Sequence, residues 1–281
     1  MKLSVFTVSM PDYDPMQTLQ VLSEIGYDGV EWRTIQDQPH DPPSFWRGNR
    51  CSMSAQDIIQ RADELKQAAA KHKMQMPTLA AYVDCEDLKA VELHMQAAAA
   101  IGAKGLRVGT GHYDPAKGGY RETLKRVRGQ YAQVAKLAEK YGVLAMTEVH
   151  PGTMTPSMHH CLAVLDGLDP RHVGIIWDVA NEVVEGLEVY RMALEIAGAY
   201  LGEVHVKNTR WDVRGQNGKQ LIWQPSSSPV WEGVVQWAQV IAELKRIGYD
   251  GWLAFEDFST VMPLRQRLTE NHNWFRQLLA Q

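Results

Sequence analysis

The feature that most constrains the fold is a short phrase that the chain repeats. A stretch with helical spacing ends at a glycine, and an apolar run begins a few residues later. The letters IGYDG occur at residues 25–29 and again at 247–251, and related phrases lie at 101–107 and 141–144. Glycine just past a helix end readily adopts the left-handed conformation found there. The repeat therefore indicates one unit, a helix followed by a strand, used along the chain.

Eight apolar runs fit the strands of such a repeat, and helical stretches separate them. The expected strands are residues 3–8, 29–33, 75–80, 105–109, 143–149, 173–178, 203–207 and 252–256, and helical spacing is clear over 55–71, 88–100, 124–140, 189–199 and 234–246. Strict alternation requires a parallel sheet. Eight units in 281 residues predict an α/β fold, a (β/α)8 TIM barrel, with residues 1–281 as a single domain. A doubly wound sheet is the alternative, but its nucleotide fingerprint needs glycines that residues 9–14 lack.

Composition narrows the classes of function. Hydrophobic residues make up 45% of the chain and charged residues 22%, as in ordinary globular proteins. A net charge of −4 provides no general attraction to nucleic acid or to an anionic membrane. Three well-separated cysteines are typical of reduced thiols, and the short apolar N-terminus does not fit a signal peptide. We expect a cytoplasmic protein with no nucleic-acid or membrane partner, and we leave open a homo-oligomer.

Four polar side chains stand where successive predicted strands end. They are Glu148, Asp178, His205 and Glu256. The carboxyl ends of barrel strands meet at one mouth, and unpaired buried charges are costly, so we expect these groups to converge on a cation. Three oxygen ligands and one nitrogen ligand suit Mn²⁺, with Mg²⁺ or Co²⁺ as alternatives. The competing interpretation is four unrelated ion-paired residues.

Further candidates follow from strand alternation and from one loop. Side chains two residues apart share a side of a strand, so His150 and Lys207 lie on the same side as the proposed ligands two positions before them. We interpret both as substrate-binding candidates, with hydrogen bonding at the barrel rim as the alternative for His150. Arg107 fits an interior ion pair better than an anion clamp. His112 lies in the glycine-containing segment 109–113, a weak signal for phosphate binding.

Four phrases carry a family resemblance. They are TEVHPG at 147–152, IWDVAN at 176–181, VHVKN at 204–208 and FE at 255–256. They resemble the sugar-phosphate isomerase/epimerase superfamily, the xylose-isomerase-like TIM barrels that include ketose 3-epimerases, hydroxypyruvate isomerase and inosose dehydratase. The resemblance implies one divalent-metal site at Glu148, Asp178, His205 and Glu256. It also implies that Glu148 and Glu256 form the acid/base pair.

One position departs from the family pattern. Asn181 stands where many relatives have a histidine, and an amide is a poor ligand for these metals. Asn181 is therefore a substrate-binding candidate, but the replacement of histidine weakens the prediction of that role. The endonucleases of the superfamily need three metals, and residues 211–214 here read WDVR without the expected Asp-x-His. This departure and the acidic net charge argue against DNA repair.

The residues and the resemblance together predict an enzyme. We expect an isomerase or epimerase that acts on a small sugar, sugar phosphate or keto-acid. Proton abstraction next to a metal-chelated carbonyl would give an enediolate. The alternatives are a metal-dependent lyase or dehydratase on a cyclic polyol, and a partner-dependent barrel subunit. Two long segments, 34–54 and 208–232, fit either binding loops or a dimer contact.

Overall fold

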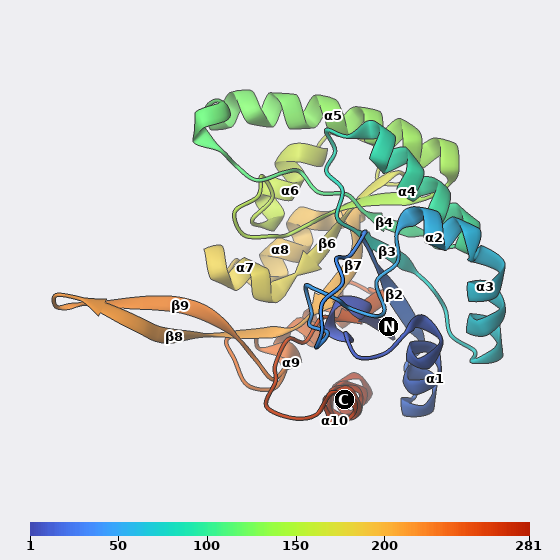
Figure 1. Cartoon of the computed structure of the whole chain (residues 1–281). Helices are drawn as coiled ribbons and strands as arrows, with labels where there is room; N and C mark the ends of the chain where they lie inside the picture. The colour runs from blue at the N-terminus through green and yellow to red at the C-terminus, as the bar shows by residue number, and fades with distance from the viewer.

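Eight parallel strands close into a barrel in the computed structural model, which describes residues 1–281 (Figure 1). The order around the barrel is β1-β10-β7-β6-β5-β4-β3-β2, so the last barrel strand pairs with the first. The strands are β1 (Lys2–Phe6), β2 (Gly29–Thr34), β3 (Thr78–Ala81), β4 (Gly105–Arg107), β5 (Leu144–Glu148), β6 (Val173–Asp178), β7 (Leu201–Val206) and β10 (Trp252–Phe255). The prediction of a TIM barrel is confirmed.

Helices follow the strands and cover the outside of the barrel (Figure 1). They are α1 (Pro15–Ile25), α2 (Ala55–Gln60), α3 (Ala62–Lys71), α4 (Leu88–Ile101), α5 (Tyr120–Tyr141), α6 (Met158–Leu165), α7 (Val179–Glu185), α8 (Tyr190–Ala197), α9 (Trp237–Arg246) and α10 (Leu264–Ala280). The expected single helix 55–71 is divided at Arg61, whose φ of −100° and ψ of 11° leave the helical region. No helix in the chain combines the length and hydrophobicity that crossing a membrane would require.

The repeated glycine phrase has the structural role that its sequence predicts. Asp14 caps α1: its Oδ1 accepts a hydrogen bond from the backbone N–H of Gln17, and its own backbone N–H donates to Gln17 Oε1. Gly26 ends the same helix with a φ of 107°, a conformation that a residue with a Cβ adopts only under strain. The chain can therefore turn directly from α1 into β2.

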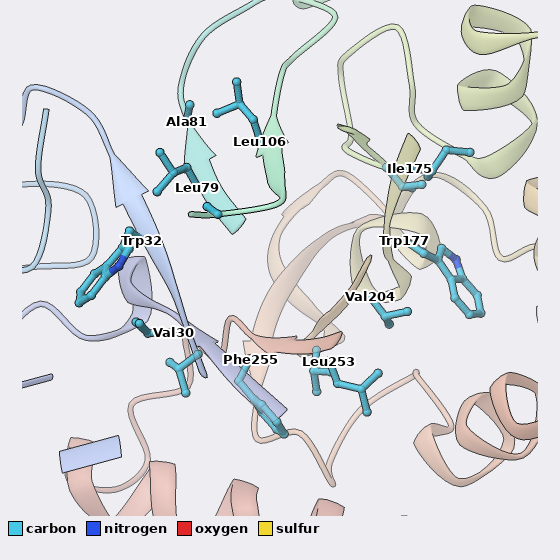
Figure 2. Close-up of a cluster of buried hydrophobic side chains, with 14 of the residues drawn as sticks. Val30, Trp32, Leu79, Ala81, Leu106, Ile175, Trp177, Val204, Leu253 and Phe255 are labelled. Carbon is cyan, nitrogen blue, oxygen red and sulfur yellow. The ribbon is translucent and has the colours of Figure 1, made fainter. Parts of the chain in front are cut away.

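Alternation along the strands separates an apolar layer from a polar interior. Figure 2 shows side chains such as Trp32, Trp177 and Phe255 pointing away from the barrel axis toward the helices. All three are almost completely buried, and burying a side chain of this kind contributes roughly 1.5–3 kcal/mol. Their chain neighbours Glu31, Asp178 and Glu256 belong to the other side of each strand. The residues that anchor the helices thus also direct carboxylates into the barrel.

The segment expected as a long loop over 208–232 is largely a β-hairpin. β8 (Asn208–Asn217) pairs antiparallel with β9 (Gln220–Ser228), and the pair projects away from the barrel (Figure 1). Gly218, with a φ of 58°, and Lys219 form its two-residue turn. A glycine at the first position of a two-residue turn, as at Gly218, is a hairpin signal, so this expectation was wrong for a reason readable in the sequence. The other long segment, 34–54, contains no helix, and its residues beyond β2 form no extended strand.

Candidate metal centre and active site

The barrel brings the four predicted ligands together at the carboxyl ends of neighbouring strands. Glu148 and Asp178 are the last residues of β5 and β6, His205 is the penultimate residue of β7, and Glu256 directly follows β10. One ligand atom from each of the four lies within 4.8 Å of every other. All four residues are buried, with Asp178 and His205 at 0% exposure. Residues more than one hundred positions apart thus form one compact polar cluster.

His205 connects this cluster to the barrel interior. Its Nδ1 lies 3.3 Å from Glu148 Oε1, 3.9 Å from Glu256 Oε2 and 4.0 Å from Asp178 Oδ2, without a well-formed hydrogen bond. Its Nε2 lies 3.2 Å from Glu31 Oε2. This buried imidazole nitrogen has no hydrogen bond of its own and faces three carboxylates. Together the nitrogen and the carboxylate oxygens form a set of ligands that suits a divalent cation. The residues present therefore fit a single metal ion.

Two cations neutralise part of the negative charge. Arg107 Nη1 lies 2.7 Å from Glu148 Oε2, so Arg107 forms the interior ion pair that its position predicts. Lys207 Nζ lies 2.7 Å from Asp178 Oδ2 and 2.6 Å from Glu256 Oε2. A substrate role for Lys207 stays a prediction, because its ammonium already contacts two of the proposed ligands.

The same contacts set the protonation of the carboxyls. Burial raises the pKa of Glu148, but the charge of Arg107 and the contact with His205 outweigh it and hold this pKa well below its ordinary value. Burial raises the pKa of Asp178 to about 7, although Lys207 opposes the rise. Glu148 is therefore ionised at neutral pH, as a base must be.

A cavity of about 670 Å³ opens above the cluster, and Glu148 and Glu256 form part of its floor. All five predicted substrate-binding candidates line it: Arg107, His112, His150, Asn181 and Lys207. The Nδ1 of His150 donates to the Pro151 carbonyl at 2.9 Å, and the Nδ1 of His112 to the Gly152 carbonyl at 3.2 Å. These bonds leave Nε2 of each ring as a free acceptor in the neutral form.

Asn181 takes a place next to a proposed ligand. Its Nδ2 donates to the Val149 carbonyl at 3.1 Å and approaches Glu148 Oε1 at 3.4 Å. Its backbone N–H donates to Asp178 Oδ1 at 2.9 Å, because Asp178 caps α7. Asn181 thus orients two carboxylates of the cluster, and its direct contact with a substrate stays a prediction.

Sequence analysis did not find a second buried cluster below the first. Glu31, Glu203 and His205 also have ligand atoms within 4.8 Å of one another, and Thr78 donates to Glu203 Oε2 at 2.6 Å. Burial raises the pKa of Glu203 to about 8, and the charge of Glu31 adds to the rise. Glu203 stands two residues before His205, so strand alternation could have identified it.

A closed TIM barrel whose last four strands converge on carboxylates and one histidine defines the class of protein. Residues 19–278 match the family model described as xylose isomerase-like TIM barrel, so the chain belongs to this family.

Particular relatives agree in fold. An inosose dehydratase from Bacillus velezensis is 25% identical over 130 residues, which span 44% of this chain and 43% of that protein. The 3-keto-D-glucoside 4-epimerase of E. coli superposes with a TM-score of 0.74 at 18% identity, over 99% of both chains. A structure of the IolI protein with a bound zinc atom superposes with a TM-score of 0.76 at 16% identity, over 100% of this chain and 98% of that one.

Proposed function

We propose that the protein is a divalent-metal-dependent isomerase or epimerase of a small sugar or a related hydroxy-carbonyl compound. One observation carries this proposal: two glutamates of a buried four-ligand cluster, Glu148 and Glu256, also line the cavity above it. The proposed ligands are Glu148, Asp178, His205 and Glu256. The oxygen-rich donor set favours Mn²⁺, with Mg²⁺ or Co²⁺ as alternatives. Three free, buried cysteines support the further proposal of a cytoplasmic protein.

The chain's own residues supply the proton chemistry. Glu148 is ionised, lies at the cavity floor and is positioned by Arg107, so it can remove a proton from a substrate carbon next to a carbonyl. Glu256 directly follows β10, which β7 and β6 separate from β5, so it approaches the cavity from a different direction. Removal by one glutamate and return by the other would invert the carbon, whereas return at the neighbouring carbon would give an isomer. A bound divalent ion would polarise the carbonyl and acidify this proton.

The test follows deuterium from solvent into substrate. Glu148→Gln and Glu256→Gln remove the carboxylate bases with little change of shape. We expect each to lower exchange by about 10²–10⁴-fold. Glu64→Gln is the matched control, because Glu64 is an exposed carboxylate paired with Arg61 on the barrel surface. Exchange at the unaltered rate in both active-site variants would refute the assignment.

A dehydratase is the second candidate, because the curated relative at 25% identity is an inosose dehydratase. The same glutamates could remove the proton while a neighbouring hydroxyl leaves as water. Mass spectrometry of the product separates the two reactions: an isomer or epimer keeps the mass of the substrate, whereas a dehydrated product loses one water. Metal content of the purified protein tests the remaining alternative, a barrel that binds no metal and acts only with a partner.

A further inference from the structure

The cavity above the cluster extends well beyond the two reacting glutamates. At about 670 Å³ it falls within the range of roughly 300–1,000 Å³ that holds drug-sized ligands. Its lining includes the buried Glu148 and Glu256 and also the exposed side chains of Trp46, Tyr82 and Asp84, which we call its outer wall. A single sugar ring on the floor would leave this outer wall without a ligand.

The charges of the wall disfavour a phosphorylated substrate. The fixed cations that line the cavity are Arg107 and Lys207, and both already pair with carboxylates at 2.6–2.7 Å. Asp84 adds an exposed carboxylate. Its side chain also fills the space that a Cβ on Gly109 would need, so a carboxylate rather than an anion-binding hollow lies against the glycine-containing loop 109–111. An incoming phosphate would meet negative charge and no free lysine or arginine.

Aromatic side chains give the outer wall a different chemistry. Trp46 is 53% exposed and packs against Phe258 with ring centroids 5.1 Å apart. Tyr82 is 40% exposed, but the guanidinium groups of Arg107 and Arg33 lie 4.5 Å and 5.2 Å from its ring centroid, so Trp46 is the residue that offers a free aromatic face. Aromatic faces carry partial negative charge and attract the weakly positive C–H groups of a sugar ring. Asp84 next to them is an acceptor for sugar hydroxyls.

We propose that Trp46, Tyr82 and Asp84 form a subsite for a second, uncharged sugar ring, so that the substrate is a neutral keto-glycoside or glycosylated ketose. This inference rests on the proposed function, because it assumes that the first ring reacts at Glu148 and Glu256. It assigns to segment 34–54, through Trp46, a role in substrate selection. This proposal replaces the weak prediction that His112 and the segment 109–113 bind phosphate.

Two matched series of probes test the subsite by deuterium exchange with the Mn²⁺-loaded protein. The first series is D-fructose, D-fructose 6-phosphate and isomaltulose, which carry a hydrogen, a phosphate and a glucosyl group on the same oxygen. The second is 3-keto-D-glucose and 3-ketocellobiose. In the series that the protein accepts, we expect the kcat/KM of the glycosylated probe to exceed those of the others at least tenfold.

Variants at Trp46 then test whether this side chain causes the preference for the glycosylated probe. The ratio to follow is the kcat/KM of the glycosylated probe divided by that of the free probe. Trp46→Ala should lower this ratio at least tenfold, mainly by raising the KM of the glycosylated probe. Trp46→Phe keeps an aromatic face and should therefore retain much of the ratio. Trp223→Ala is the matched control, because Trp223 is 54% exposed and lies on the hairpin outside the cavity wall. Equal or better turnover of the free or phosphorylated probe, or an unchanged ratio in Trp46→Ala, overturns the subsite. Exchange into none of the probes overturns the proposed function itself and the subsite with it.

Discussion

At the scale of single residues, the site depends on how His205 is held. A histidine can present either nitrogen to a metal, and the bond made by the other nitrogen selects which. Here Nε2 lies 3.2 Å from Glu31 Oε2 inside the barrel, and Nδ1 faces Glu148, Asp178 and Glu256. Glu31 is 0% exposed. We interpret Glu31 as the residue that positions His205 for metal binding.

Replacement of Glu31 tests this interpretation. We expect Glu31→Leu to weaken Mn²⁺ binding by roughly 10–100-fold, because the acceptor for the Nε2 proton is lost. Glu31→Gln should lose less Mn²⁺ affinity, since its amide oxygen can still accept the hydrogen bond from His205 Nε2. Titration calorimetry measures both affinities.

Glu203→Gln is the control for these variants. The pKa of Glu203 is raised to about 8 by burial and by the charge of Glu31, so this residue is already mostly neutral at pH 7 and the amide resembles it. Mn²⁺ affinity should therefore change little in this variant. Equal affinities for Glu31→Leu and the unaltered protein, with both folded by circular dichroism, would contradict the role of Glu31.

At the scale of elements, the hairpin β8–β9 is an addition to the barrel that is anchored at its base. Most of its length is exposed, and a two-stranded hairpin alone is marginally stable in water. Asn208, 3% exposed, joins its base to the segment before α9. Its Nδ2 donates to the carbonyls of Val230 and Val235, and its Oδ1 accepts from the N–H groups of Thr209 and Val235, all within 3.1 Å.

Asn208→Ala should therefore cost about 2–4 kcal/mol of the free energy of unfolding, because it leaves several buried backbone groups without partners. Chemical denaturation measured by circular dichroism gives this value. Asn217→Ala, at the exposed end of β8 beside the turn, should change the stability by less than about 0.5 kcal/mol. A cost for Asn208→Ala as small as that of Asn217→Ala would show that these bonds do not hold the hairpin.

At the scale of the whole molecule, barrel closure gathers more negative than positive charge inside. Glu31, Glu148, Asp178 and Glu256 are buried carboxyls with side chains in the interior or at its mouth. Arg107 pairs with Glu148, and Lys207 pairs with Asp178 and Glu256, whereas Glu31 contacts His205. Strands from both ends of the chain contribute to this set, so the folded state alone forms the site. A divalent cation at the cluster would therefore bind the folded protein and stabilise it.

Metal removal should lower the thermal midpoint of the protein. Mn²⁺ at one hundred times its dissociation constant stabilises the folded state by about 2.7 kcal/mol, which corresponds to roughly 5 °C for a chain of this size. Scanning calorimetry with EDTA and after addition of excess Mn²⁺ measures the shift. His205→Ala should abolish the shift because it removes the nitrogen ligand. Identical midpoints with EDTA and with Mn²⁺ in the unaltered protein would argue against the metal centre.

The barrel and the positions of its four candidate ligands were predictable from the amino-acid sequence alone. Strand alternation and the order of helices and strands are local properties, and parallel strands place their carboxyl ends at one mouth. The hairpin also had a local signal, a glycine at position 218 that opens a two-residue turn, although the segment was expected to be a loop. These features need no knowledge of which distant residues meet.

The residues that meet across the barrel could be identified only from the folded structure. The contact of Glu31 with His205 joins positions 174 residues apart, and the ion pair of Arg107 with Glu148 joins positions 41 apart. Trp46, Tyr82 and Asp84 share a cavity wall because β2 and β3 are neighbours and their following segments leave the same mouth. Such contacts depend on the closure of the sheet and on loop paths, which side-chain periodicity does not encode.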